Sequence, residues 1–156
     1  MTKSDLKILK EKVFEANLNL QREKLVIFTF GNVSGIDRKQ NIIAIKPSGV
    51  NYKNLKPADM VLVSLDGKII DSDLNPSSDT KTHLQLYRSF PEIGGVAHTH
   101  SRYATILAQA CMPVLCLGTT HADYFYGDIP CTDIISDESI NKDYEDETGR
   151  DRKSVV

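Results

Sequence analysis

The sequence predicts an α/β fold in which a central, largely antiparallel sheet is covered by helices. Two observations lead to this prediction. Short segments rich in β-branched residues fill the middle of the chain, and Asp66-Gly67 between two of them is a strong hairpin signal. Apolar residues at helical spacing precede and follow these segments, so helices are expected on the faces of the sheet.

Helices are expected in four stretches of the chain. The first, over residues 3–21, has apolar residues spaced three and four apart. The second, over residues 80–90, follows a loop whose serine or aspartate can cap it, and it ends before a proline. A third is expected over residues 101–110. The last begins after Ser136, carries two acidic residues in its first turn and stops at Gly149.

The expected strands are short and either β-branched or aromatic. A Gly-Asn pair separates the first two, and a Pro-Ser-Gly turn follows the third. The Asp-Gly turn joins the fourth and fifth, and the sixth is an apolar run that leads into two histidines. The strands are expected over residues 25–30, 33–36, 41–46, 60–65, 68–70, 93–97 and 114–117.

The composition excludes several classes of function. With 156 residues the chain is long enough for one domain with a hydrophobic core. Its net charge is −2 and its basic residues are scattered, which argues against a nucleic-acid partner. No apolar run reaches the about 18 residues that a membrane span requires, and no apolar signal core follows Met1, so a cytoplasmic location is expected. The three cysteines lack C-x2-C spacing and are predicted to be reduced and mostly buried: Cys111, Cys116 and Cys131.

His98-Thr99-His100 is the strongest candidate for a metal site. In an extended segment residues i and i+2 point to the same side, so both imidazoles would share one face of the strand end. Such a pair supplies part of a Zn²⁺ site when oxygen ligands lie nearby. The alternative is one surface histidine and one hydrogen-bonded core histidine.

Three loops have a composition suited to a phosphate group. They contain small residues, hydroxyls and exposed backbone N–H groups, and one of them also contains a lysine. Each loop taken alone could be an ordinary turn. Together, beside the two histidines, they indicate a phosphorylated ligand next to a metal. The loops are Gly31-Asn32-Val33-Ser34, Lys46-Pro47-Ser48-Gly49 and Ser77-Ser78-Asp79.

A fourth polar cluster spans residues 119–127 and contains His121, Asp123 and two tyrosines. A carboxyl group beside an apolar wall can have its pKa shifted toward use as an acid or a base, which makes Asp123 a candidate proton carrier. The alternatives are a capping carboxylate for Asp123, and core packing for Tyr124 and Tyr126.

These segments together resemble the class II aldolase family, most closely its L-ribulose-5-phosphate 4-epimerase branch. The similarity covers nearly the whole chain up to Gly149, with the motifs in the family's order. The matching stretches are residues 31–34, 46–49, 76–80, 94–101 and 118–127. The resemblance implies the three-layer class II aldolase architecture and a homotetramer whose sites lie at subunit interfaces.

The resemblance also assigns roles to the motif residues. A divalent cation, Zn²⁺ by default and Mn²⁺ or Co²⁺ as alternatives, would be held by His98 and His100, with Asp79 on or beside it. Asp123 would donate or accept a proton. The sugar-phosphate substrate would be bound by Gly31, Asn32, Lys46, Ser48, Gly49, Ser77 and Ser78.

The implied reaction is epimerisation of L-ribulose 5-phosphate to D-xylulose 5-phosphate at C4, a step of pentose breakdown. The C4 hydrogen is not acidic, so the route implied by the resemblance is metal-assisted cleavage of the C3–C4 bond followed by re-addition to the other face. Asp79 favours the epimerase branch, because the family's aldolases tend to carry Glu at that place. The alternatives are a sugar-phosphate aldolase of the L-fuculose-phosphate type, or an inactive protein that binds metal or phosphate.

The sequence departs from the family pattern after Gly149. The family takes a third metal-binding histidine, and a tyrosine from a neighbouring subunit, from segments beyond the last match. The expectation is therefore a domain over residues 1–149 that is incomplete at its C-terminal end, followed by an aberrant charged tail over residues 150–156. A truncated chain of this kind is expected to expose a sheet edge and apolar surface.

Overall fold

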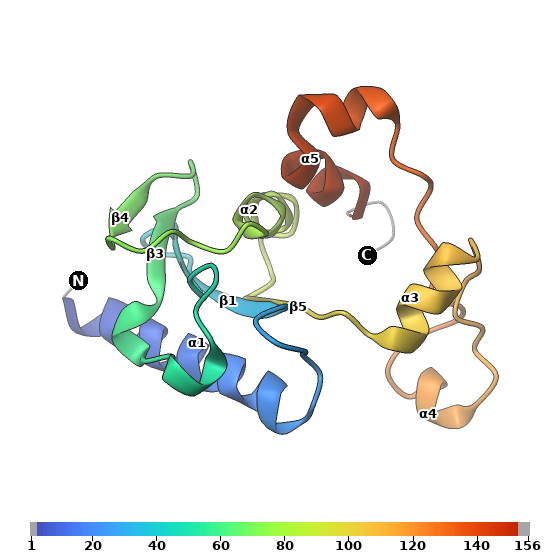
Figure 1. Ribbon diagram of the computed structural model, residues 1–156, viewed down its shortest axis with the longest axis horizontal. Helices are drawn as coiled ribbons and strands as arrows, with labels where there is room; N and C mark the ends of the chain where they lie inside the picture. Colours follow the sequence, from blue (N-terminus) through green and yellow to red (C-terminus); the bar gives the residue numbers. More distant parts are fainter. Residues whose placement is uncertain (1–2, 153–156) are drawn as a thin grey trace.

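The computed structural model describes residues 3–152, and its centre is a five-stranded antiparallel sheet (Figure 1). The strands lie in the order β4-β3-β2-β1-β5, so β5 returns to pair with β1 at the edge. Their bounds are β1 Asn32–Asp37, β2 Ile42–Ile45, β3 Val61–Ser64, β4 Ile69–Asp71 and β5 Gly95–His98. The helices are α1 Lys3–Arg22, α2 Thr80–Ser89, α3 Arg102–Gln109, α4 Thr119–Ala122 and α5 Asp137–Arg152, with short 3-10 helices η1 Tyr52–Asn54 and η2 Pro57–Asp59.

Helix α1 covers one face of the sheet through the apolar stripe that the sequence predicts. Val13 on this stripe packs against Ala44 of β2. Asn17 is also fully buried, because its side chain serves as a partner for the backbone of β1. Its Nδ2 donates to Val33 O at 2.9 Å and its Oδ1 accepts from Val33 N at 2.9 Å. This pair of bonds fixes the start of β1, where Asn32 lies.

Helix α2 covers the opposite face, which confirms the predicted three-layer architecture. Successive strand residues point to opposite sides, so Ile43 and Ile45 face α2 while Ala44 faces α1. Leu84 and Tyr87 of α2 fill the space above them. Burial of each such side chain is worth about 1.5–3 kcal/mol, so both apolar layers stabilise the sheet.

A cluster of polar side chains lies between β1 and α2. Ser34 Oγ is 2.7 Å from His83 Nδ1 and 2.8 Å from the Tyr87 hydroxyl, and all three residues are buried. Arg38 lies with its guanidinium 5.4 Å from the Tyr87 ring centroid and donates to backbone oxygens at the C-terminal end of α2, including Phe90 O at 2.8 Å. These bonds fix the rotation of α2 over β1.

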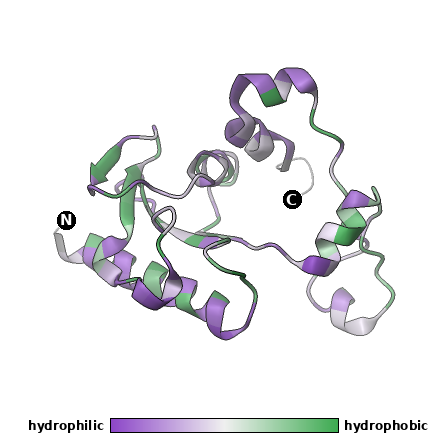
Figure 2. Cartoon of the chain, in the orientation of Figure 1, coloured by the Kyte–Doolittle hydropathy of each residue, from purple (hydrophilic) through white to green (hydrophobic). Residues whose placement is uncertain are grey.

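The chain beyond β5 forms three further helices. Helices α3 and α4 stand away from the sheet on the side of β5, and α5 returns to lie beside α2 (Figure 1). Helix α5 is mostly hydrophilic, whereas the segments before it include hydrophobic stretches (Figure 2). Exposed apolar side chains in this region include Tyr103, Leu117, Tyr124 and Tyr126. None of the helices described within residues 3–152 is long and apolar enough to cross a membrane.

The predicted strand over residues 25–30 is wrong. Phe30 N donates to Ile27 O, which closes a turn, and Phe28 has φ +56°, which an extended strand excludes. The predicted strand over residues 114–117 is also wrong, because Val114 forms only an isolated bridge with Ile129. Apolar and β-branched composition indicated strands here, but neither segment has a partner strand over its length.

The predicted helix stop at Gly149 is wrong as well, since α5 continues to Arg152. The glycine is there because two helices approach closely. A Cβ at this position would lie 2.8 Å from Gln85 Cβ and 3.1 Å from Thr82 Cα, both on α2. Residues 150–152 of the predicted charged tail are therefore helical, and residues 153–156 lie outside the described part of the chain.

Two expectations about burial also fail. Cys111 is exposed, and Cys116 and Cys131 are only partly buried, because they lie in the α3–α4 region away from the sheet. Tyr124 and Tyr126 are exposed as well, so neither packs in a core of this chain.

Candidate functional site

The predicted motifs meet in one cavity of about 500 Å³. It lies at the end of the sheet where β1 begins, β5 ends and α2 begins. Every site residue predicted from the sequence, except Asp123, lines it: Gly31, Asn32, Lys46, Ser48, Gly49, Ser77, Ser78, Asp79, His98 and His100. The sheet register explains this assembly, because Asn32 of β1 pairs with His98 of β5 across the sheet.

His98 and His100 lie together on one wall of the cavity. Their Nε2 atoms are 2.9 Å apart, and their ring centroids are 4.8 Å apart with an interplanar angle of 76°. A Zn–N bond is about 2.0–2.1 Å long, so both nitrogens can reach one common ion. The Phe30 ring, 5.9 Å from that of His100, provides an apolar neighbour.

Asp79 faces the cavity because Asn32 holds its carboxylate. Asn32 Nδ2 donates to Asp79 Oδ2 at 2.7 Å and to Ser77 Oγ at 3.1 Å. Of the serine or aspartate predicted to cap α2, Asp79 occupies the N-cap position without a capping bond from its side chain, while Ser77 Oγ accepts from Asp79 N at 3.3 Å. Asn32 is itself buried, and its Oδ1 has no hydrogen-bond partner within residues 3–152.

The described residues supply two converging metal ligands and not three. Within residues 3–152, no group of three His, Cys, Asp or Glu side chains is close enough to hold a metal ion. The imidazole pair fits two positions of a divalent cation, and the acidic Asp79 lines the same cavity without joining the pair. The assignment of Asp79 as a ligand stays a prediction.

Two of the small-residue loops that line the cavity are bound to each other. Ser77 N donates to Lys46 O at 3.0 Å, and Ser48 N donates to Asn75 O at 2.9 Å. Lys46 is only 2% exposed, yet it is one of the residues that line the cavity. Burial lowers the pKa of its ammonium group, because desolvation disfavours the charged form. The Tyr52 ring lies beneath it, 4.9 Å from Nζ.

Asp123 is not in this cavity. It is the C-cap residue of α4, is exposed, and lies in the region that stands away from the sheet. The structure therefore does not bring the predicted proton carrier to the two histidines within one chain.

Sequence reasoning did not identify the wall formed by α5. Tyr144, Glu145 and Thr148 line the cavity from this helix. Two contacts with α2 hold the helix there. Thr82 Oγ1 donates to Glu145 O at 2.7 Å, and Lys81 Nζ forms an ion pair with Asp143 Oδ2 at 2.7 Å. The spacing of the three residues is that of one helix face, but nothing in the sequence indicates which neighbour that face meets.

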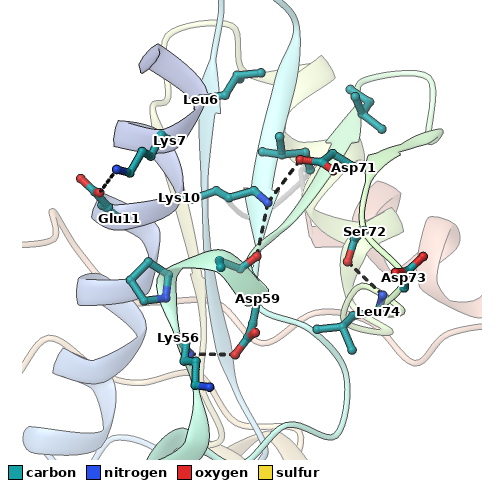
Figure 3. Close-up of a pocket in the computed structure, with 14 residues that line it drawn as sticks. Leu6, Lys7, Lys10, Glu11, Lys56, Asp59, Asp71, Ser72, Asp73 and Leu74 are labelled. Atoms are coloured by element: carbon teal, nitrogen blue, oxygen red, sulfur yellow. Dashed lines mark hydrogen bonds and ion pairs between the residues drawn. The ribbon is translucent and has the colours of Figure 1, made fainter. Parts of the chain in front are cut away.

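A larger groove of about 1240 Å³ lies between α1, η2 and β4, away from the motifs (Figure 3). Several of its charged groups are engaged with groups of the groove itself. Lys10 Nζ donates to Ala58 O at 3.4 Å and lies 3.8 Å from Asp71 Oδ2, and Lys7 pairs with Glu11. None of the predicted site residues lines this groove, so the chemistry is assigned to the smaller cavity.

Comparisons with known proteins agree with the fold. Residues 11–156 match the model of the Class II Aldolase and Adducin N-terminal domain. The structure is similar to an L-fuculose 1-phosphate aldolase, with 27% identity and a TM-score of 0.76 over 94% of this chain and 69% of that chain.

Two further solved structures have the same fold. For L-fuculose-1-phosphate aldolase from Thermus thermophilus the identity is 25% and the TM-score 0.65, over 78% of this chain and 59% of that chain. For YgbL from Escherichia coli the identity is 27% and the TM-score 0.59, over 65% of this chain and 48% of that chain. The chain thus spans between about half and about seven tenths of the lengths of these three proteins.

Proposed function

Because the chain belongs to the class II aldolase and adducin N-terminal domain family, we propose that it binds a sugar phosphate beside a divalent cation and acts on a carbon–carbon bond of that substrate. One observation carries the proposal. A single cavity is lined by a converging imidazole pair and by a buried lysine with small hydroxyl-bearing loops.

The histidine wall is proposed to hold the cation. His98 and His100 would present their Nε2 atoms to it, and Asn32 would keep the Asp79 carboxylate turned toward the same space. A bound Zn²⁺, or Mn²⁺ or Co²⁺, would supply Lewis-acid stabilisation of negative charge on substrate oxygens when the carbon–carbon bond opens.

The wall formed by Lys46 and the small-residue loops is proposed to bind the phosphate. Lys46 contributes positive charge, Ser48, Ser77 and Ser78 contribute hydroxyl groups, and Gly49 allows close approach of the backbone. In the epimerase reaction this binding of the phosphate would keep the aldehyde fragment in place while it rotates. In an aldolase reaction it would hold the substrate until the fragment leaves.

The finer assignment is to L-ribulose-5-phosphate 4-epimerase, based on the resemblance of the motifs and on aspartate rather than glutamate at position 79. The similarity to L-fuculose 1-phosphate aldolases supports the second candidate, an aldolase acting on a sugar phosphate of that type. A chain that binds metal and phosphate without turnover is the third.

Asp123 is proposed to be the proton carrier, delivered by assembly of subunits. It lies on an exposed region that also exposes large apolar side chains, among them Leu117, Tyr124 and Tyr126. Exposed apolar clusters of this kind favour association with another protein surface. A homo-oligomer, a tetramer by resemblance, would cover these side chains and bring Asp123 toward a cavity.

The reaction is tested by incubating the metal-loaded protein with L-ribulose 5-phosphate in the presence of an aldehyde trap. Formation of D-xylulose 5-phosphate without trapped aldehyde supports the epimerase, whereas dihydroxyacetone and trapped glycolaldehyde phosphate support the aldolase. If neither forms while phosphate still raises the melting temperature, the non-catalytic candidate is correct.

The site is tested by metal analysis of three variants. His98→Asn and His100→Asn are expected to lower the bound metal and the activity together. Asp123→Asn is expected to keep the metal and to lose turnover. His121→Asn is the matched control for metal content, because this histidine lies outside the cavity and bonds to Gly127 O. An unchanged metal content in both variants of the pair would disprove the metal site.

A further inference from the structure

A buried tyrosine contacts two residues that line the cavity, Gly31 and Lys46. Tyr52 is 2% exposed, and its hydroxyl and its ring have separate partners. We propose that Tyr52 is a positioning residue of the site: its hydroxyl fixes the Gly31 loop beside the histidine strand, and its ring holds the Lys46 ammonium at the phosphate wall. This inference rests on the proposed function.

The hydroxyl fixes the loop that precedes β1. Tyr52 OH donates to Gly31 O at 2.8 Å, and Gly31 has φ +81°, a conformation that favours glycine. A Cβ on Gly31 would lie 2.9 Å from His98 O and 2.6 Å from Val26 Cγ1. The backbone of Gly31 is therefore pressed against the strand end that carries the first imidazole, and Tyr52 holds it there. Burial raises the pKa of Tyr52 to about 12, so the hydroxyl keeps its proton at neutral pH.

The ring holds the lysine. Lys46 Nζ is 4.9 Å from the centroid of the Tyr52 ring and donates to Pro47 O at 3.3 Å. An aromatic face attracts an ammonium ion without accepting one of its three N–H donors in a conventional hydrogen bond. The ring thus stabilises the position of the charge while leaving donors for a phosphate oxygen.

The competing explanation is that Tyr52 only fills the core. It packs with Leu55 and Met60 in the cluster beneath α1, and a core role predicts loss of stability with no specific effect on phosphate. Tyr87 offers a matched control on the other face of the sheet. It too is buried, with its hydroxyl bonded to Ser34 and the Arg38 guanidinium over its ring. Neither of these partners lines the cavity, whereas both partners of Tyr52 do.

The test measures binding of inorganic phosphate to the full chain by isothermal titration calorimetry. Tyr52→Phe removes only the hydroxyl and is expected to weaken phosphate binding about 2- to 10-fold. Tyr52→Leu also removes the ring and is expected to weaken it by a further factor of about 3 to 30. In a Lys46→Met background the difference between the two variants is expected to disappear, because the ring then has no cation to hold. With substrate, both variants are expected to raise KM by more than they lower kcat.

The outcomes separate the positioning role from the proposed function. Tyr87→Phe and Tyr87→Leu are expected to lose stability and to keep the phosphate affinity of the wild type. If Tyr52→Phe and Tyr52→Leu bind phosphate as the wild type does, the positioning role is wrong and the proposed function stands. If Tyr52→Leu does not fold, Tyr52→Phe alone decides by the same criterion. If the wild type itself binds no phosphate, the phosphate wall and this inference are both wrong.

Discussion

The contact between α2 and α5 depends on one glycine, and the substitution Gly149→Ala tests it. The new Cβ would lie 2.8 Å from Gln85 Cβ and 3.1 Å from the backbone atom Thr82 Cα, so one helix must move. Overpacking against backbone costs about 2–3 kcal/mol, and the better helix propensity of alanine returns about 1 kcal/mol. The expected loss is therefore about 1–2 kcal/mol in the free energy that docks α5.

Hydrogen exchange of the α5 amides measures this loss directly, because α5 opens separately from the sheet when its docking weakens. A loss of about 1–2 kcal/mol lowers their protection by about 5- to 30-fold. The control is Gly94→Ala, whose Cβ would meet no atom within 4 Å. Control protection should stay within about twofold of the wild type. If the α5 amides of Gly149→Ala are protected as well as those of the wild type, α5 does not pack on α2 in solution, and the α5 wall of the cavity is wrong.

Three further predictions concern the buried polar groups. Ser34→Ala removes the shared partner of His83 and Tyr87 and is expected to lower the free energy of unfolding by about 1–3 kcal/mol, measured by urea titration. Arg38→Ala removes the donor to the carbonyls at the C-terminal end of α2 and is expected to lower the free energy of unfolding by about 2–3 kcal/mol. Amides at that end of the helix are expected to lose their protection from hydrogen exchange first. Burial raises the pKa of Tyr87 and of Tyr52 to about 12, above the about 10 of an unfolded tyrosine. The contribution of the two hydroxyls to the free energy of unfolding is therefore complete below pH about 10 and is lost as the pH rises toward 12. Tyr87→Phe should flatten the fall of the urea midpoint above pH 10, and an unchanged slope would contradict this assignment.

Local patterns predicted the parts of the fold that local interactions determine. The Asp66-Gly67 hairpin forms as expected, with Gly67 at φ +92° between β3 and β4. The apolar spacing of α1 and the stop of α2 before Pro91 also match the structure. In each case the residues that decide the structure lie within a few positions of one another.

Long-range contacts account for the failures. Residues 25–30 have strand composition, but strand pairing needs a partner, and β5 pairs with β1 starting only at Asn32. A glycine near a helix end is typical of a helix stop, which is how Gly149 looks in the sequence. Its packing role cannot be seen there, because its close neighbours on α2 are more than sixty residues away along the chain. Hydrophobicity alone does not tell which apolar side chains a chain leaves exposed, as Tyr126 demonstrates.

The same distinction between local patterns and long-range contacts applies to the candidate site. The motif residues were identified because histidines, serines and glycines at these spacings are chemically distinctive. Tyr52 was missed because a buried tyrosine resembles any other core aromatic until the positions of Gly31 O and Lys46 Nζ are known. The α5 wall was missed because it depends on a helix that docks from the far end of the chain.

The pairing of Asn32 with His98 has a consequence for how this protein tolerates change in chain length. Side chains of a strand alternate in direction, so one residue inserted or deleted in β5 ahead of His98 would send that imidazole to the opposite side of the sheet. Loops that neither pair with another segment nor line the cavity can lengthen without this effect, because they lie outside the ladder. Variation among related sequences should accordingly accumulate length changes in the loops, while the spacing from Gly95 to His98 stays constant.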